Sequence, residues 1–96
     1  MVQISGRVRR RLVADFGPRG DAMADRIELV IASAPMAERQ DPERLHAAVV
    51  LASGGTLEGF ESQLELASID WRDLLMNAGL AHLDYPARLD AEFGPA

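Results

Sequence analysis

The segment DPERLHAAVVLASGG, residues 41–55, carries the most complete set of helix signals in the chain. Asp41 suits the N-cap, because its carboxylate can accept hydrogen bonds from free amides of the first turn, and Pro42 suits the first helical position. Gly54 follows as the residue that ends the helix. Apolar side chains cover one face and much of the rest: Leu45, Ala47, Ala48, Val49, Val50, Leu51 and Ala52. We therefore predict a central helix that is buried on most sides.

On both sides of this helix, apolar residues recur at helical spacing, and no run alternates with period two for long enough to indicate a strand. Capping and breaking residues delimit further helices over about Gly6–Phe16, Asp21–Ser33, Thr56–Ala67, Asp70–Gly79 and Tyr85–Glu92. The one candidate linker is APMAERQ, residues 34–40, in which Pro35 stops the second helix. The sequence therefore predicts a single all-α domain over residues 1–96, a compact irregular or orthogonal bundle of five to six short helices.

The same spacing identifies the side chains that should face the core. In the first two helices they are Ile4, Val8, Leu12, Phe16, Met23, Ile27, Val30, Ile31 and Ala34. In the fourth and fifth helices they are Leu57, Phe60, Leu64, Ala67, Trp71, Leu74, Leu75 and Ala78.

Composition argues against several classes of function. The 96 residues include no cysteine, which rules out disulfides, thiolate zinc sites and cysteine nucleophiles. The net charge of −5 argues against general nucleic-acid binding. No stretch approaches the roughly 18 apolar residues of a membrane span, so we expect a cytoplasmic protein without a membrane partner. No nucleophile motif occurs and only His46 and His82 offer an imidazole base, so we predict a non-enzymatic protein without a cofactor or metal.

The segment DWRDLLMNAGLAH, residues 70–82, has the outline of the first half of a helix-turn-helix. Helix capping explains the same segment without a DNA-binding role. Asp70 can accept from the amide of Asp73, Ile69 and Leu74 are placed for a hydrophobic staple, and Gly79 suits a Schellman ending. The helix that follows carries Arg88 among several acids, which would repel a phosphate backbone. The sequence therefore favours a capped structural helix over a DNA-reading element.

The longer segment DWRDLLMNAGLAHLDYPARLDAEFG, residues 70–94, resembles the C-terminal part of short helical bacterial proteins of unknown function. Those proteins share the tryptophan-arginine-aspartate start, the AGL sequence and an aromatic-proline pair. The likeness extends over residues 43–94. It implies a helical fold, and it brings no activity, cofactor or site residue. The absence of lysine and the many alanines suggest a bacterial origin.

Arginines form the first candidate site. Arg7, Arg10 and Arg11 should project from the face opposite the apolar stripe of the first helix, where their charge opposes the helix dipole. They could dock to an acidic protein surface, nucleic acid or anionic lipid. Alternatively, they form a solvated face or pair with the protein's own acids.

Glu58, Glu61 and Glu65 form the second candidate, an acidic ridge on one side of the fourth helix. Like charges at this spacing repel one another and destabilise an isolated helix, so a partner of opposite charge would stabilise this one. Our hypothesis is that the ridge pairs with the arginines of the first helix, within the chain or across a dimer. The alternative is a plain solvated ridge.

Two further motifs have structural explanations. The sequence ERLH, from Glu43 to His46, matches the Glu-x-x-His of di-iron bundles, but those sites need two such pairs and two more glutamates. We expect His46 to be a partly buried, hydrogen-bonded histidine beside Ser53. The sequence SGGT, residues 53–56, could cradle an anion, but one helix ending and the next beginning explain it.

Leu29, Leu66 and Met76 lie outside the apolar stripes of their own helices. We interpret them as a dimer or partner face, with burial inside one chain as the alternative. The sequence thus predicts a small interaction module that self-associates or binds another protein. A nucleic-acid-associated accessory protein that uses Arg7, Arg9, Arg10 and Arg11 is the other function that it allows.

Overall fold

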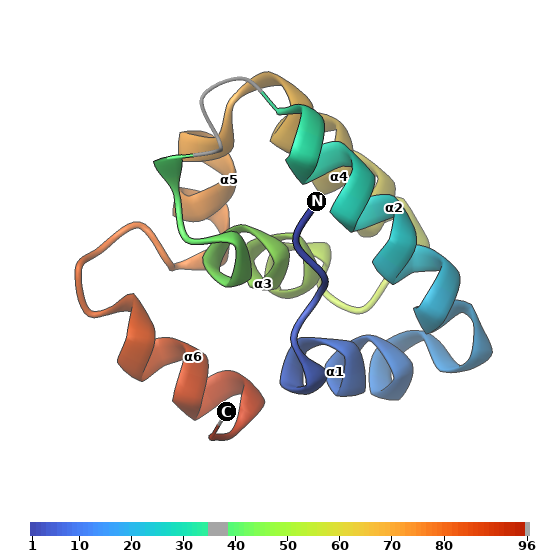
Figure 1. The fold of residues 1–96 in the computed structure, drawn as a ribbon. Helices are drawn as coiled ribbons and strands as arrows, with labels where there is room; N and C mark the ends of the chain where they lie inside the picture. Colours follow the sequence, from blue (N-terminus) through green and yellow to red (C-terminus); the bar gives the residue numbers. More distant parts are fainter. Residues whose placement is uncertain (35–38, 96) are drawn as a thin grey trace.

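The computed structural model describes residues 1–34 and 39–95, and in them the fold is all-α, as predicted (Figure 1). The elements are α1 (Gly6–Phe16), the short 3-10 helix η1 (Gly17–Arg19), α2 (Gly20–Ser33), α3 (Pro42–Ser53), α4 (Leu57–Ile69), α5 (Trp71–Ala78) and α6 (Tyr85–Phe93). None of the described helices is both long enough and apolar enough to cross a membrane. Residues 35–38 of the predicted linker, including Pro35, lie outside the described residues.

Helix α3 is the centre of the molecule, as its sequence predicts. It contacts α1, α2, α4, α5 and α6, and it crosses the middle of the bundle in Figure 1. Asp41 caps it by accepting a hydrogen bond from the amide of Glu43 at 3.0 Å, and Gly54 ends it in the left-handed conformation, with φ of 64°. Its side chains from Leu45 to Val50 are all buried.

Helices α2 and α4 pack against each other on one side of α3, and α1 packs across the start of α2. Phe60 of α4 is fully buried, and its ring meets that of Phe16 edge to face with 6.0 Å between centroids. The predicted inward residues of α1 and α2 are buried or partly buried. In α4 the buried face begins at Phe60, so the prediction that Leu57 points inward is wrong: it is the first residue of the helix and remains exposed.

A tight turn joins α3 to α4. The hydroxyl of Thr56 accepts from the amide of Gly59 at 3.0 Å, which confirms it as the N-cap. Gly59 lies so close to the end of α3 that a Cβ there would be 2.1 Å from the carbonyl oxygen of Ser53. The glycine therefore allows the two helices to approach at this point.

Helix α5 begins and ends as predicted but is capped differently. Asp70 accepts from the amide of Arg72 at 3.0 Å, not from that of Asp73. Ile69 is exposed, so the predicted staple with Leu74 does not form. Helix α4 continues to Ile69, so this residue is the last of α4 and not part of an extended segment before α5. The Schellman ending is confirmed, since the amide of Leu80 donates to the carbonyl of Leu75 at 2.9 Å.

Helix α6 packs on α1 and α3 at the opposite end of the bundle from the α4–α5 junction (Figure 1). Leu89 and Phe93 are its buried side chains, and Pro86 lies in its first turn. Few other apolar side chains hold α6 to the rest, which makes the polar contacts of its two ends important.

Candidate functional site

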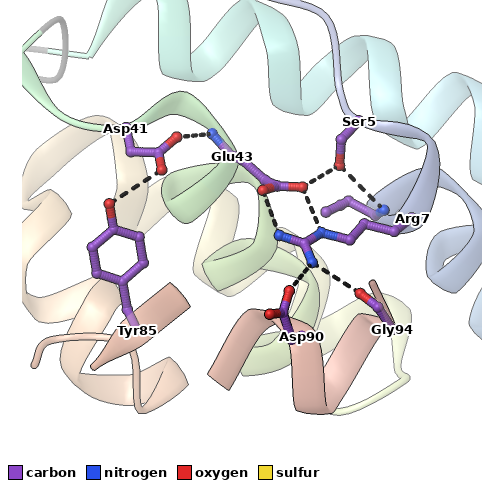
Figure 2. A network of polar contacts seen from close by, with 8 residues as sticks. Ser5, Arg7, Asp41, Glu43, Tyr85, Asp90 and Gly94 are labelled. Atoms are coloured by element: carbon purple, nitrogen blue, oxygen red, sulfur yellow. Dashed lines mark hydrogen bonds and ion pairs between the residues drawn. The ribbon is translucent and has the colours of Figure 1, made fainter. Parts of the chain in front are cut away.

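Arg7 is buried, with 7 % of its side chain exposed. Its guanidinium forms a two-pronged pair with Glu43 of α3, through Nε to Oε2 at 2.8 Å and Nη2 to Oε1 at 2.7 Å. Nη1 donates to Oδ1 of Asp90 at 2.6 Å and to the carbonyl oxygen of Gly94 at 2.8 Å. Figure 2 shows the guanidinium between α3 and α6. The prediction that Arg7 projects from the first helix is therefore wrong, because these two helices close over it.

The contacts of Arg7 leave it little capacity for a partner. It makes four hydrogen bonds, against the five donors that a guanidinium has. Hydrogen bonds to Glu43 and Asp90 raise the pKa of Arg7, and the hydrogen bonds from Arg7 and then Ser5 lower the pKa of Glu43 despite partial burial. The hydroxyl of Ser5, the N-cap of α1, donates to Oε2 of Glu43 at 2.6 Å. This network joins α1, α3 and α6.

A second polar link holds the start of α6. The hydroxyl of Tyr85 donates to Oδ2 of Asp41 at 3.2 Å (Figure 2), and the guanidinium of Arg44 lies 4.2 Å from the Tyr85 ring centroid. Burial and the Asp41 carboxylate raise the pKa of Tyr85, so the hydroxyl keeps its proton. The N-cap of α3 therefore also positions α6.

The other arginines of α1 have different surroundings. Arg9 pairs with Asp21 of α2 at 2.8 Å, and Nε of Arg11 pairs with Asp15 at 3.2 Å. Arg11 also donates to the carbonyl oxygen of Glu92 at 3.1 Å. Arg10 is exposed, and no acid among the described residues pairs with it. The predicted basic face is thus divided among internal ion pairs, with Arg10 alone turned outward.

The acidic ridge does not meet the arginines of α1 within the chain. Glu61 pairs instead with Arg26 of α2, whose Nη2 lies 2.6 Å from Oε1, and Glu58 and Glu65 are exposed. The intramolecular form of the hypothesis is wrong, because α2 lies beside α4 and supplies the nearer guanidinium. The hydrogen bond from Arg26 lowers the pKa of Glu61.

Glu43 and His46, the pair that matches the di-iron motif in sequence, have different surroundings in the structure. Glu43 is engaged by Arg7, and no cluster of three acids or histidines that could hold an ion occurs among the described residues. His46 is 1 % exposed, and its Nδ1 has no hydrogen-bond partner in the described part of the chain. The expectation of a partly buried histidine is therefore wrong, because the side chain is fully buried, and the nearby Ser53 hydroxyl donates to the carbonyl of Val49. Burial lowers the pKa of His46.

An apolar groove of about 390 Å³ lies beside α5, between the start of α3 and the connection to α6. Met76, which is 68 % exposed, and Leu83, which is 94 % exposed, both line it. Trp71 also lines it, and its charged lining residues are Arg44 and Arg72. We refer to these five residues as the α5 groove.

The three residues predicted as an interaction face separate in the structure. Met76 belongs to the α5 groove, Leu29 is exposed on α2, and Leu66 is partly buried against the core. The sequence analysis missed Leu83, which belongs to no helix. A leucine among polar residues in the connection AHLDY was the signal that could have revealed it.

Comparisons of the chain with protein-family models, with curated proteins and with solved structures give no match.

Proposed function

We propose that this protein is a small non-enzymatic interaction module that binds an acidic, amphipathic segment of another protein in the α5 groove. The observation that carries the proposal is the exposure of Met76 and Leu83 on one groove. A single exposed leucine or methionine on a surface needs no explanation, whereas two such side chains beside a tryptophan form an apolar patch of the kind that partners cover.

The composition of the groove supports a protein ligand. Tryptophan, methionine and arginine are enriched in the centres of protein interfaces, where aromatic and arginine anchors carry much of the binding energy. An amphipathic helix could insert apolar side chains at helical spacing between Trp71, Met76 and Leu83, in the manner of other helix-in-groove complexes.

Charge supports an acidic partner. Arg44 and Arg72 border the groove, although the whole chain carries a net charge of −5. Carboxylates at the ends of the partner segment would form ion pairs with these two arginines. Two copies of this chain would repel each other through their net charge, so we propose a different protein as the partner and not a second copy.

The test is affinity capture from a lysate of the cell that makes the protein, with three baits. These are the wild-type chain, Met76→Glu with Leu83→Glu, and Leu29→Glu as a matched control on α2. We expect the wild type and the control to recover a stoichiometric protein. The double variant should recover at least about tenfold less of it, because burying two glutamate carboxylates in an apolar interface costs free energy. Circular dichroism checks that the baits are folded.

Equal recovery with the double variant, or no stoichiometric protein with the wild type, would contradict the proposal. A nucleic-acid partner would show itself by steep loss of binding as salt rises, whereas an apolar groove complex should persist. Acids of the same chain engage Arg7, Arg9 and Arg11, so of the four arginines that the nucleic-acid function would use only Arg10 has no ion pair among the described residues.

A further inference from the structure

Helix α6 is held to the rest of the domain by few apolar contacts. It buries two side chains, Leu89 and Phe93, whereas every other α-helix among the described residues buries at least three residues. The connection that leads to it is exposed at each of residues 81–84. Segments with few buried apolar contacts open locally, at a lower free energy than the whole domain. Docking of α6 therefore depends on the polar contacts at its two ends.

Each end of α6 is held by a polar contact in which one partner is exposed (Figure 2). Nη1 of Arg7 donates to Asp90 at 2.6 Å, and the Asp90 side chain is 64 % exposed. At the other end the Tyr85 hydroxyl donates to the exposed Asp41 at 3.2 Å. Ion pairs with an exposed partner contribute little free energy, because water and salt screen them. Helix α6 can thus leave without breaking the two hydrogen bonds between Arg7 and Glu43.

The N-terminal end of α6 also shapes the α5 groove. Leu83 lies two residues before Tyr85, so the position of this groove residue follows that of α6. The guanidinium of Arg44, another groove residue, lies 4.2 Å from the Tyr85 ring centroid, and its Nε donates to the carbonyl oxygen of Leu80 at 2.9 Å. Leu83 and Arg44 therefore owe part of their placement to the docked helix.

We propose that α6 is a clasp that regulates the α5 groove, which binds its partner while α6 is docked and loses affinity when α6 leaves. The proposal rests on the function proposed above for the groove. Undocking frees the side chains of Leu83 and Arg44, so a partner would have to order both of them at a cost in entropy. The apparent Kd then rises as the docked fraction falls, and a bound partner in turn holds α6 on the domain.

The first measurement is native-state amide hydrogen exchange of the isolated wild-type chain, which needs no partner. We expect the amides of α6 to be protected at least about 100-fold less than the slowest amides of α3, because α6 opens while the rest of the domain stays folded. Equal protection of α6 and α3 would overturn the proposal, since it would show that α6 opens only when the whole chain unfolds.

Tyr85→Phe with Asp90→Arg is the undocking variant. It removes the hydroxyl at one end of α6 and places a second guanidinium beside Arg7 at the other end. The control is Asp25→Arg, which makes the same charge change at an exposed carboxylate of α2 that no arginine among the described residues pairs with.

We expect the α6 amides of the undocking variant to exchange within about tenfold of the rate of an unstructured chain, because a helix of this length is unstable alone. The amides of α3 should stay protected. The NMR resonances of the Trp71 indole N–H and the Met76 methyl group should shift, since both side chains line the groove. Protected α6 amides in this variant, or unchanged groove resonances beside an unprotected α6, would overturn the proposal.

Capture from the lysate then connects the clasp to the partner. The undocking variant should recover at least about tenfold less of the partner than the wild type or Asp25→Arg. Equal recovery would overturn the regulation by α6 and leave the function of the groove in place. Failure of the wild type to recover a protein would contradict the function of the groove and not its coupling to α6, because hydrogen exchange and the groove resonances measure that coupling without a partner.

Discussion

Arg7 shows how one side chain can hold a small domain together. Its guanidinium bonds to residues 36 and 83 positions away in sequence, so a single group connects α1 with both α3 and α6. A fork of planar N–H donors is required for this, because Glu43 is engaged by two nitrogens at once. Lysine carries the same charge but has no such fork.

Arg7→Lys should therefore destabilise the fold. We expect a loss of about 2 kcal/mol in the free energy of unfolding, from at least one lost charge-assisted hydrogen bond and from imperfect pairing of the Glu43 and Asp90 carboxylates with a buried cation. Arg10→Lys is the matched control in the same helix and should stay within about 0.5 kcal/mol of wild type. Urea denaturation followed by circular dichroism measures both. Equal effects of the two substitutions would contradict the role assigned to Arg7.

His46 should make stability depend on pH. Burial lowers its pKa in the folded state, whereas the unfolded chain takes up the proton at the ordinary pKa near 6.5. The unfolded state thus binds more protons as pH falls below that value, and the free energy of unfolding decreases by at most about 1.4 kcal/mol per pH unit from this group. His46 therefore contributes full stability above about pH 6.5 and less below it.

The measurement is the melting temperature between pH 7.5 and 5, for wild type, His46→Leu and the exposed control His82→Gln. We expect the decrease with falling pH to be smaller in His46→Leu and unchanged in the control. A parallel decrease in all three proteins would show that His46 does not titrate between the folded and unfolded states as argued.

At the scale of the elements, short-range signals set most helix ends. Asp41, Thr56 and Asp70 cap α3, α4 and α5, and Gly54 and Gly79 end α3 and α5, all as the sequence predicts. These signals act within a few residues of the chain, which is why they can be recognised without tertiary information. The extension of α4 to Ile69 was missed, because it depends on how closely α5 follows.

Gly59 gives a prediction that runs against helix propensity. Alanine normally stabilises a helix by about 1 kcal/mol relative to glycine. At this position its Cβ would lie 2.1 Å from the carbonyl oxygen of Ser53, so α3 and α4 would have to separate. We expect Gly59→Ala to lower the free energy of unfolding by about 2 kcal/mol or more, as overpacking does.

Gly6→Ala is the control, since its Cβ would meet only the flexible end of Arg10 at 3.8 Å. Its unfolding free energy should be unchanged or slightly raised. A thermal melt of both variants decides the matter, and stabilisation by Gly59→Ala would refute the close approach of the two helices.

At the scale of the whole molecule, the domain is nearly isotropic, with principal extents of 31 × 26 × 23 Å and a central helix that touches every other α-helix. The surface distributes its apolar side chains unevenly, and the α5 groove collects Met76 and Leu83 with Trp71. The net charge of −5 opposes association of like copies.

Sedimentation velocity should accordingly show a monomer in the isolated protein at physiological salt. Met76→Glu with Leu83→Glu should leave the sedimentation coefficient unchanged while reducing capture of the partner at least about tenfold. A wild-type dimer that the double variant dissociates would instead make the groove a self-association surface, and the proposal of a different partner would be wrong.

The helical fold, the central place of α3 and the capping of its neighbours follow from the local order of residues, because helix propensity, capping and amphipathic spacing act over one or two turns. The contacts of the polar side chains do not follow from the local order of residues. Arg7 is buried, Glu61 pairs with Arg26, and Nδ1 of His46 has no hydrogen-bond partner among the described residues. Each of these outcomes depends on residues that the fold brings together from distant parts of the chain. The α5 groove likewise exists only between elements, so only the tertiary structure places its side chains on one surface.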